Sequence, residues 1–111
     1  MSLEQPHAID AVGYDEALDA VVLTIADSWS WENEREHLLA LQTKLNAYFN
    51  FIESGELSRR YPKAIERRLI IQIVSRYQRP GSADEFFSKA AQAAALLNGE
   101  IRLRHHPSTT R

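Results

Sequence analysis

The sequence of 111 residues has no cysteine, few glycines and no long apolar run. The absence of cysteine excludes disulfides, thiolate metal sites and a cysteine nucleophile. A glycine-rich phosphate loop is excluded as well, because the four glycines (Gly13, Gly55, Gly81 and Gly99) are far apart. The longest apolar stretches are strand-sized and fall well short of the roughly 18 residues that cross a bilayer. We therefore expect no membrane span.

The overall length and the two ends suggest one cytoplasmic domain. Residues 1–6 lack a basic region followed by an apolar stretch, so we expect no signal peptide. Together with the missing cysteine, this favours the cytoplasm. We expect a single domain over residues 1–105 and a flexible tail over residues 106–111, because the tail is polar and contains proline. No cofactor is expected, since no nucleotide-binding fingerprint appears.

Charge is distributed unevenly, although the net charge is only −2. Residues 1–58 hold 2 basic and 11 acidic side chains, a balance of −9, whereas residues 59–111 hold 11 basic and 4 acidic side chains, a balance of +7. The boundary falls inside the expected domain, so the two halves must pack against each other. Their charges then either pair within the subunit or orient an association between subunits.

Hydrophobic periodicity predicts four strands and two helices. The strands are expected at residues 8–14, 19–26, 68–77 and 100–105, and the helices at residues 31–53 and 83–98. We expect Ser30 to cap the first helix, Ser82 with Glu85 to cap the second, and Gly55 and Gly99 to end them. Residues 56–67 form an irregular basic connector. The order ββαβαβ predicts an α/β two-layer sandwich (α+β in a broader sense), with one four-stranded mixed sheet and two helices on one face.

A long residue pattern resembles a family of short bacterial proteins of unknown function. It contains Ile9-Asp10-Ala11, Val22-Leu23-Thr24-Ile25, Asp27, Trp31 and the helical run Glu36-His37-Leu38-x-x-Leu41-Gln42-x-Lys44-x-Asn46-x-Tyr48-x-x-Phe51-Ile52-Glu53-Ser54-Gly55. The resemblance implies a bacterial single-domain protein. It implies no activity, ligand or catalytic residue.

Asp27, Glu36 and His37 are the candidate catalytic residues. Asp27 ends the second strand, and the other two lie on the following helix, at a junction where α/β proteins often place sites. No nucleophile elbow or zinc-protease motif accompanies them, so we lean towards a protein that is not an enzyme. The structural alternative for His37 is packing near Trp29 or Trp31. We expect no metal, because no set of three protein ligands is apparent.

Trp29, Trp31, Ile70 and Val74 are the candidate partner-binding residues. Two indoles at the start of a helix are costly to expose, and tryptophan is common at binding hot spots. Ile70 and Val74 alternate with core positions of the third strand, so they would form an apolar patch on the sheet face opposite the helices. Such a patch favours binding of a protein partner or a second copy, most simply in a two-fold homodimer.

The basic residues provide an alternative function, anion or nucleic-acid binding. The candidates are Arg59, Arg60, Lys63, Arg68, Arg76, Arg102 and Arg104. A nucleic-acid backbone is bound by such arrays, but sheets that bind single strands also present aromatic side chains, and Tyr14 is the sole candidate. Nucleic acid is thus the less favoured partner. The favoured function is protein interaction without catalysis, with anion binding and a small enzyme as alternatives.

Overall fold

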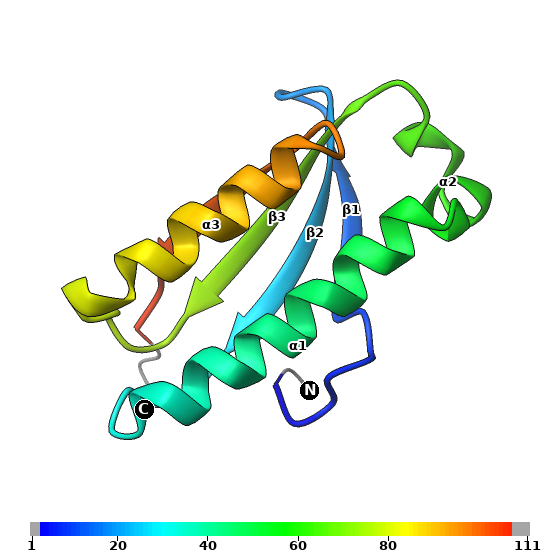
Figure 1. Cartoon of the computed structure of the whole chain (residues 1–111). Helices are drawn as coiled ribbons and strands as arrows, with labels where there is room; N and C mark the ends of the chain where they lie inside the picture. Colours follow the sequence, from blue (N-terminus) through cyan, green and yellow to red (C-terminus); the bar gives the residue numbers. More distant parts are fainter. Residues whose placement is uncertain (1–2, 108–111) are drawn as a thin grey trace.

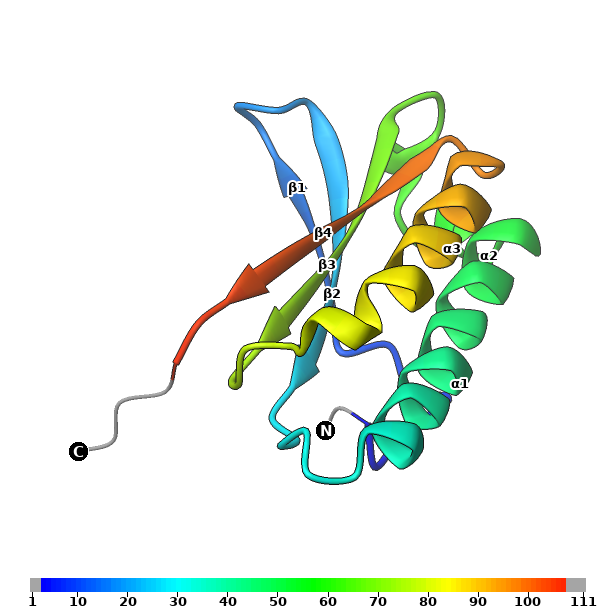
Figure 2. The same cartoon turned by 60° about the vertical axis from the view of Figure 1, so that its left-hand side comes forward.

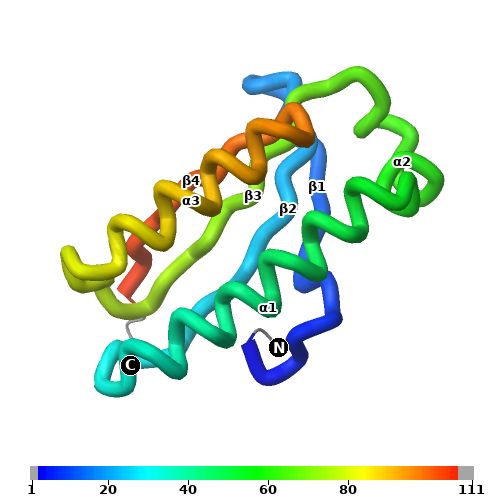
Figure 3. The backbone as a smooth tube through the Cα atoms, viewed as in Figure 1, coloured from blue at the N-terminus to red at the C-terminus, as the bar shows by residue number. Residues whose placement is uncertain are grey.

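A computed structural model describes residues 3–107 of the chain. Figure 1 shows its helices and strands, and Figure 3 follows the same path as a tube. In chain order the elements are β1 (Ala11–Asp15), β2 (Ala20–Asp27), α1 (Glu34–Glu53), α2 (Glu56–Arg60), the 3-10 turn η1 (Pro62–Ala64), β3 (Arg68–Ser75), the 3-10 turn η2 (Gly81–Ala83), α3 (Asp84–Ala95) and β4 (Gly99–His105).

The strands form one mixed sheet in the order β1-β2-β3-β4, which confirms the expected four-stranded mixed sheet. β1 is antiparallel to β2, whereas β2, β3 and β4 are parallel. The element order differs from ββαβαβ, because the connector contains α2 and η1. Gly55, at φ +88°, ends α1 and starts α2, and Pro62 begins η1, where its missing N–H is tolerated.

The two long helices lie on the same side of the sheet (Figures 1 and 2). Alternate residues of the central strands point towards these helices and are buried with apolar side chains of α1 and α3. This core includes Val21, Leu23, Ile25, Leu41, Leu45, Leu69, Ile71, Ile73 and Phe87. The intervening residues form the opposite side of the sheet, called the outer face here. By register it comprises Ala11, Gly13, Asp15, Ala20, Val22, Thr24, Ala26, Arg68, Ile70, Gln72, Val74, Glu100, Arg102 and Arg104.

The capping expected at the start of each long helix is not found in the structure. α1 is capped by Asn33, whose side chain accepts from the Glu36 N–H at 3.2 Å and donates to the Glu36 carboxylate at 3.1 Å. This reciprocal cap lies three residues beyond Ser30, the residue expected from the sequence. The capping role expected for Ser82 is also wrong, because its hydroxyl donates to Glu34 of α1 at 2.8 Å. Ser82 therefore links the starts of the two long helices.

Of the two glycines expected to end the long helices, one does so and the other does not. Gly55 takes the left-handed conformation after α1, as expected. After α3 this conformation belongs to Asn98, at φ +61°, and Gly99 is the first residue of β4. A Cβ on Gly99 would lie 3.3 Å from the Leu69 oxygen and 3.4 Å from the Ala94 oxygen. Gly99 is thus needed for close approach to β3 and α3.

The ends of the chain bear on two further expectations. His106 and Pro107 are exposed after β4, and the rest of the expected tail, residues 108–111, lies outside the described residues. Within residues 3–107, no helix combines the length and the apolar character that crossing a membrane requires.

Candidate functional site

Asp27 and His37 form a buried pair where β2 ends and α1 begins. Their Oδ2 and Nε2 atoms are 2.6 Å apart, and each side chain is 1% exposed. The other ring nitrogen, Nδ1, lies 2.9 Å from the carbonyl oxygen of Ser30, which can only accept. This geometry suits a ring that donates from Nδ1 to the carbonyl and faces the carboxylate with Nε2. Both ring nitrogens are thus in use.

The two indoles enclose this pair. Trp31 stacks on the His37 ring with 3.7 Å between centroids, and Trp29 tilts against it at 5.7 Å. The Trp29 indole N–H donates to Glu4 at 2.8 Å, and its backbone N–H donates to Asp27 at 3.1 Å. Both indoles are half-buried and pack against the core. The structure thus places Trp29 and Trp31 in internal packing around the imidazole.

The candidate catalytic set is only partly brought together. Asp27 and His37 meet, whereas Glu36 is exposed and bonds to the cap residue Asn33. Each side chain of the Asp27–His37 pair is 1% exposed, so the pair is closed off from solvent in this conformation. Its physical effect is to hold the start of α1 against the end of β2.

A second buried polar network involves Lys44, which sequence reasoning missed. Lys44 on α1 is fully buried, and its Nζ donates to the carbonyls of Gln5 and Ala8 at 2.8 Å and to Asp10 at 2.9 Å. All three ammonium protons are satisfied. The sequence signal was the position of Lys44 on the apolar stripe, three residues after the buried Leu41. A charged residue there is costly unless it is paired.

Tyr48 extends this network into the sheet. Its hydroxyl donates to the Thr24 carbonyl at 2.5 Å and accepts from the Asp10 N–H at 2.8 Å. Burial is the main cause that raises the pKa of Tyr48, so the hydroxyl stays protonated and able to donate. The other Asp10 oxygen accepts from the Ala26 N–H at 3.0 Å. Segment 3–10 is therefore bonded to both α1 and β2, and Figure 3 shows it beside α1.

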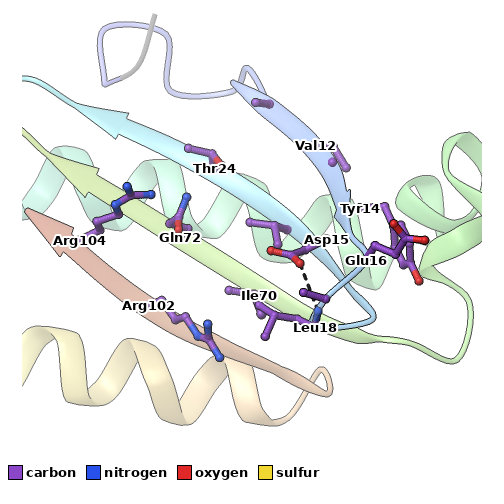
Figure 4. A pocket seen from close by; sticks show the side chains of 14 residues that line it. Val12, Tyr14, Asp15, Glu16, Leu18, Thr24, Ile70, Gln72, Arg102 and Arg104 are labelled. Carbon is purple, nitrogen blue, oxygen red and sulfur yellow. Dashed lines mark hydrogen bonds between the residues drawn. The ribbon is translucent and has the colours of Figure 1, made fainter. Parts of the chain in front are cut away.

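The outer face is hollowed, and Figure 4 shows the side chains that line this depression. It has a volume of about 750 Å³ and lies between the β1–β2 turn and β4. Ile70 forms its floor and is only 1% exposed, with Leu18 of the turn beside it in Figure 4. Val74 is half-buried on the same face. The apolar patch expected at Ile70 and Val74 is thus less exposed than the strand pattern implies.

Two arginines border this hollow at β4. The Arg102 Nε donates to Glu100 at 2.7 Å, whereas the guanidinium group of Arg104 has no hydrogen bond or ion pair within residues 3–107. Thr24, Gln72 and Arg102 lie directly across from one another on adjacent strands, and Arg104 is two residues further along β4. This row presents a hydroxyl, an amide and guanidinium groups, all of which can donate to an anion.

The other basic candidates are dispersed. Arg59 is exposed on α2, and Arg60 pairs with Glu56 of the same helix at 3.2 Å. Arg68 starts β3, and Arg76 lies beyond its end, over the ring of Tyr77. None of these residues lines the hollow that Arg102 and Arg104 border. The seven basic candidates therefore do not converge on one site.

Tyr14 lines the turn end of the hollow, and its ring also contacts Lys63 of the connector. Tyr14 pairs in register with Val21, which points towards the helices, and its ring lies 4.5 Å from the Lys63 ammonium. Its hydroxyl donates to Asp19 at 2.6 Å, and Arg67 donates to the same carboxylate at 3.0 Å. This tyrosine does not supply an aromatic platform for bases. Within residues 3–107, the ion pairs that join the acidic and basic halves are Asp19–Arg67 and Glu56–Arg60.

Comparison with known proteins assigns a family but no activity. A family of unknown function, DUF6572, matches residues 1–108 of the chain. No curated protein and no solved structure matches it.

Proposed function

Since the chain belongs to DUF6572, a family without an assigned function, we propose from its own geometry that it is a protein-interaction domain. Its outer face binds a partner segment that carries apolar and acidic side chains. The observation that carries this proposal is the open hollow on the sheet face opposite α1 and α3. We place the interaction in the bacterial cytoplasm, because a cysteine-free sequence suits a reducing compartment.

The chemistry of the hollow supports an acidic partner. Arg104 is exposed and has no partner among the described residues, so it can form a bidentate contact with a carboxylate. Gln72 and Thr24 offer further donors in the adjacent row. Val22 and Ile70 supply an apolar floor, against which an aliphatic side chain can pack. The contact surface thus combines one apolar strip with one basic border.

Charge also supports a protein over a nucleic acid. Asp15 and Glu16 line the same hollow at the turn end, where they would repel a phosphate backbone. The aromatic ring nearest this end, Tyr14, is engaged with Lys63. Binding of single strands depends on stacking as well as on charge. A segment with a few carboxylates suits this mixed border better than a polyanion does.

The proposal is tested by NMR titration with a defined probe, a peptide of about ten residues that has two glutamates at one end and alternating valine and serine along the rest. At about 3.3 Å per residue it is long enough to cross the hollow. We expect a dissociation constant of about 1 mM or tighter, with shifts at the amides of Gly13, Thr24 and Arg104. A peptide with lysine in place of glutamate should not bind.

Two glycine variants provide a matched comparison. A Cβ on Gly13 or on Gly81 meets no atom within 4 Å, so a side chain can be added at either position without a clash at its first atom, and circular dichroism checks that the fold is kept. Gly13→Glu places a carboxylate in the hollow and should weaken peptide binding about tenfold, whereas Gly81→Glu, remote from the hollow, should not change it. Equal affinity for both variants, or tighter binding of a single-stranded oligonucleotide at the same amides, would overturn the proposal.

A further inference from the structure

β4 is an edge strand with an open side. It pairs with β3, and no strand within residues 3–107 pairs with its other edge. In Figure 2 it is drawn in front of β3. The Asn98 carbonyl accepts from Leu69 and the His106 N–H donates to Ser75, so even-numbered residues direct their backbone groups to β3. Because backbone groups alternate sides along a strand, those of Ile101 and Leu103 face the open edge.

The sequence of β4 is complementary to a second copy of β4 that runs in the opposite direction. When a second β4 runs antiparallel with Arg102 at the centre, Ile101 lies opposite Leu103 and Glu100 lies opposite Arg104. Gly99 then faces His105, so all seven residues of the strand are paired. We infer that the protein forms a two-fold homodimer through antiparallel pairing of β4 with β4 of a second copy, centred on Arg102.

The backbone geometry permits this register. In an antiparallel ladder, opposite residues that exchange hydrogen bonds alternate with opposite residues that do not. Ile101 and Leu103 direct their groups outward and are opposite each other in this register. Arg102 directs its groups to β3, so its pair is a non-hydrogen-bonded pair. The unpaired backbone groups of one copy therefore meet those of the other.

The side chains support the same register on both faces. Ile101 and Leu103 are half-buried at the end of the core, and opposing copies would cover their exposed parts. On the outer face, Arg104 lacks a partner among the described residues and would meet Glu100 of the second copy. The central arginines face each other, but each Arg102 is bound to its own Glu100 at 2.7 Å, which offsets the repulsion.

This inference does not rest on the proposed function, although Arg104 takes part in both, since it borders the hollow and would pair with Glu100 of the second copy. Pairing at the edge leaves the outer face of each copy open and joins the two into one wider sheet. Gly13→Glu should therefore weaken peptide binding and leave the dimer intact, whereas the disulfide formed in Arg102→Cys reports on the dimer alone. Arginines on an edge strand can also serve to block pairing, an outcome that the experiment below includes.

The test uses the absence of cysteine from the natural chain. In Arg102→Cys the two thiols lie on residues whose Cα atoms are about 4.5 Å apart across the two-fold axis, a separation that a disulfide spans. Mild oxidation should convert most of this variant to a disulfide-linked dimer on a non-reducing gel. Arg104→Cys is the matched control, because it lies on the same strand and face but opposite Glu100, and it should remain largely monomeric.

Charge exchange gives a second measurement that needs no cysteine. Arg104→Glu places two carboxylates opposite each other and should weaken the dimer about tenfold in sedimentation velocity. The double variant Glu100→Arg with Arg104→Glu should recover part of this loss, because it restores opposite charges across the pair but removes the Glu100 that binds Arg102. Both residues are at the strand surface, and circular dichroism checks that the fold is kept. A wild-type monomer at about 500 µM, or equal cross-linking of both cysteine variants, would contradict the inference.

Discussion

At the scale of single residues, the molecule is held together by polar side chains on the buried side of α1. His37 and Lys44 lie on the buried face of α1, together with Leu41 and Tyr48. Each of the two polar side chains is paired with an aspartate. Removal of one member of such a pair leaves an uncompensated buried charge, and this destabilises a protein more than the intact pair stabilises it. These residues belong to the pattern that carries the family resemblance, and their contacts give them a structural role.

Lys44→Met retains the length of the side chain and removes its charge. We expect a loss of about 3–5 kcal/mol in the free energy of unfolding, because Asp10 and two carbonyls lose their donor. Urea denaturation measures the loss. The control is Lys89→Met, since that ammonium is exposed and pairs with Glu85 at 3.6 Å, and a change within about 0.5 kcal/mol is expected. Similar losses in the two variants would show that the Lys44 network is not stabilising.

At the scale of elements, the ends of α1 are set by local chemistry. Asn33 and Glu36 satisfy each other at its start, and Gly55 reverses the chain direction at its end. This glycine is also the boundary between α1 and α2, so its left-handed conformation fixes the direction in which the basic connector leaves the helix. A residue with a Cβ adopts that conformation at a cost.

Gly55→Ala should therefore destabilise the protein by about 1–2 kcal/mol, because φ is +88° at this position. Gly13→Ala is the comparison, since Gly13 has no positive φ and a Cβ there meets open space. It should be neutral or stabilise slightly, through a less flexible unfolded chain. Thermal unfolding of both variants distinguishes these effects. A Gly55→Ala variant as stable as Gly13→Ala would disprove the role assigned to Gly55.

At the scale of the whole molecule, an ion pair between Asp19 and Arg67 joins the acidic and basic halves where the β1–β2 turn contacts the connector. The hydrogen bond from the Tyr14 hydroxyl, followed by the one from Arg67, holds the pKa of Asp19 below its usual value. A depressed carboxyl pKa stabilises the folded state above the pKa of the unfolded chain, and that contribution is lost as pH falls through the folded pKa. The ion pair between the two halves, Asp19 with Arg67, therefore stabilises the protein less as the pH falls.

The variant Asp19→Asn tests this ion pair. Asparagine tolerates the left-handed backbone of Asp19, at φ +50°, but cannot titrate. Wild type should be the more stable protein near neutral pH, and the difference should disappear as pH falls from about 5 to about 2. Urea denaturation across this range measures it, with Glu32→Gln as an exposed control. A difference that stays constant with pH would contradict the role given to Asp19.

How far the sequence predicts this molecule depends on which residues are considered. The alternation in β2 and β3 places their core residues correctly, and Gly55 ends α1 where expected. For the candidate site, Asp27 and His37 do meet, but their burial could not be read from spacing. Ile70 lies on the outer face, as its position in the strand predicts, yet it is buried near the hairpin turn. Residues of the turn and of β3 that line one hollow are far apart in the chain, so spacing could not bring them together.

The sequence by itself determined the features that depend on near neighbours: the strands, the two long helices, the lack of thiol chemistry and the uneven charge. These follow from side-chain type and periodicity over a few residues. The tertiary structure alone decided the strand order, the partners of Lys44 and the open edge of β4. The physical reason is that Asp10 and Lys44 are 34 positions apart. Their contact forms only when the N-terminal segment, β2 and α1 pack together.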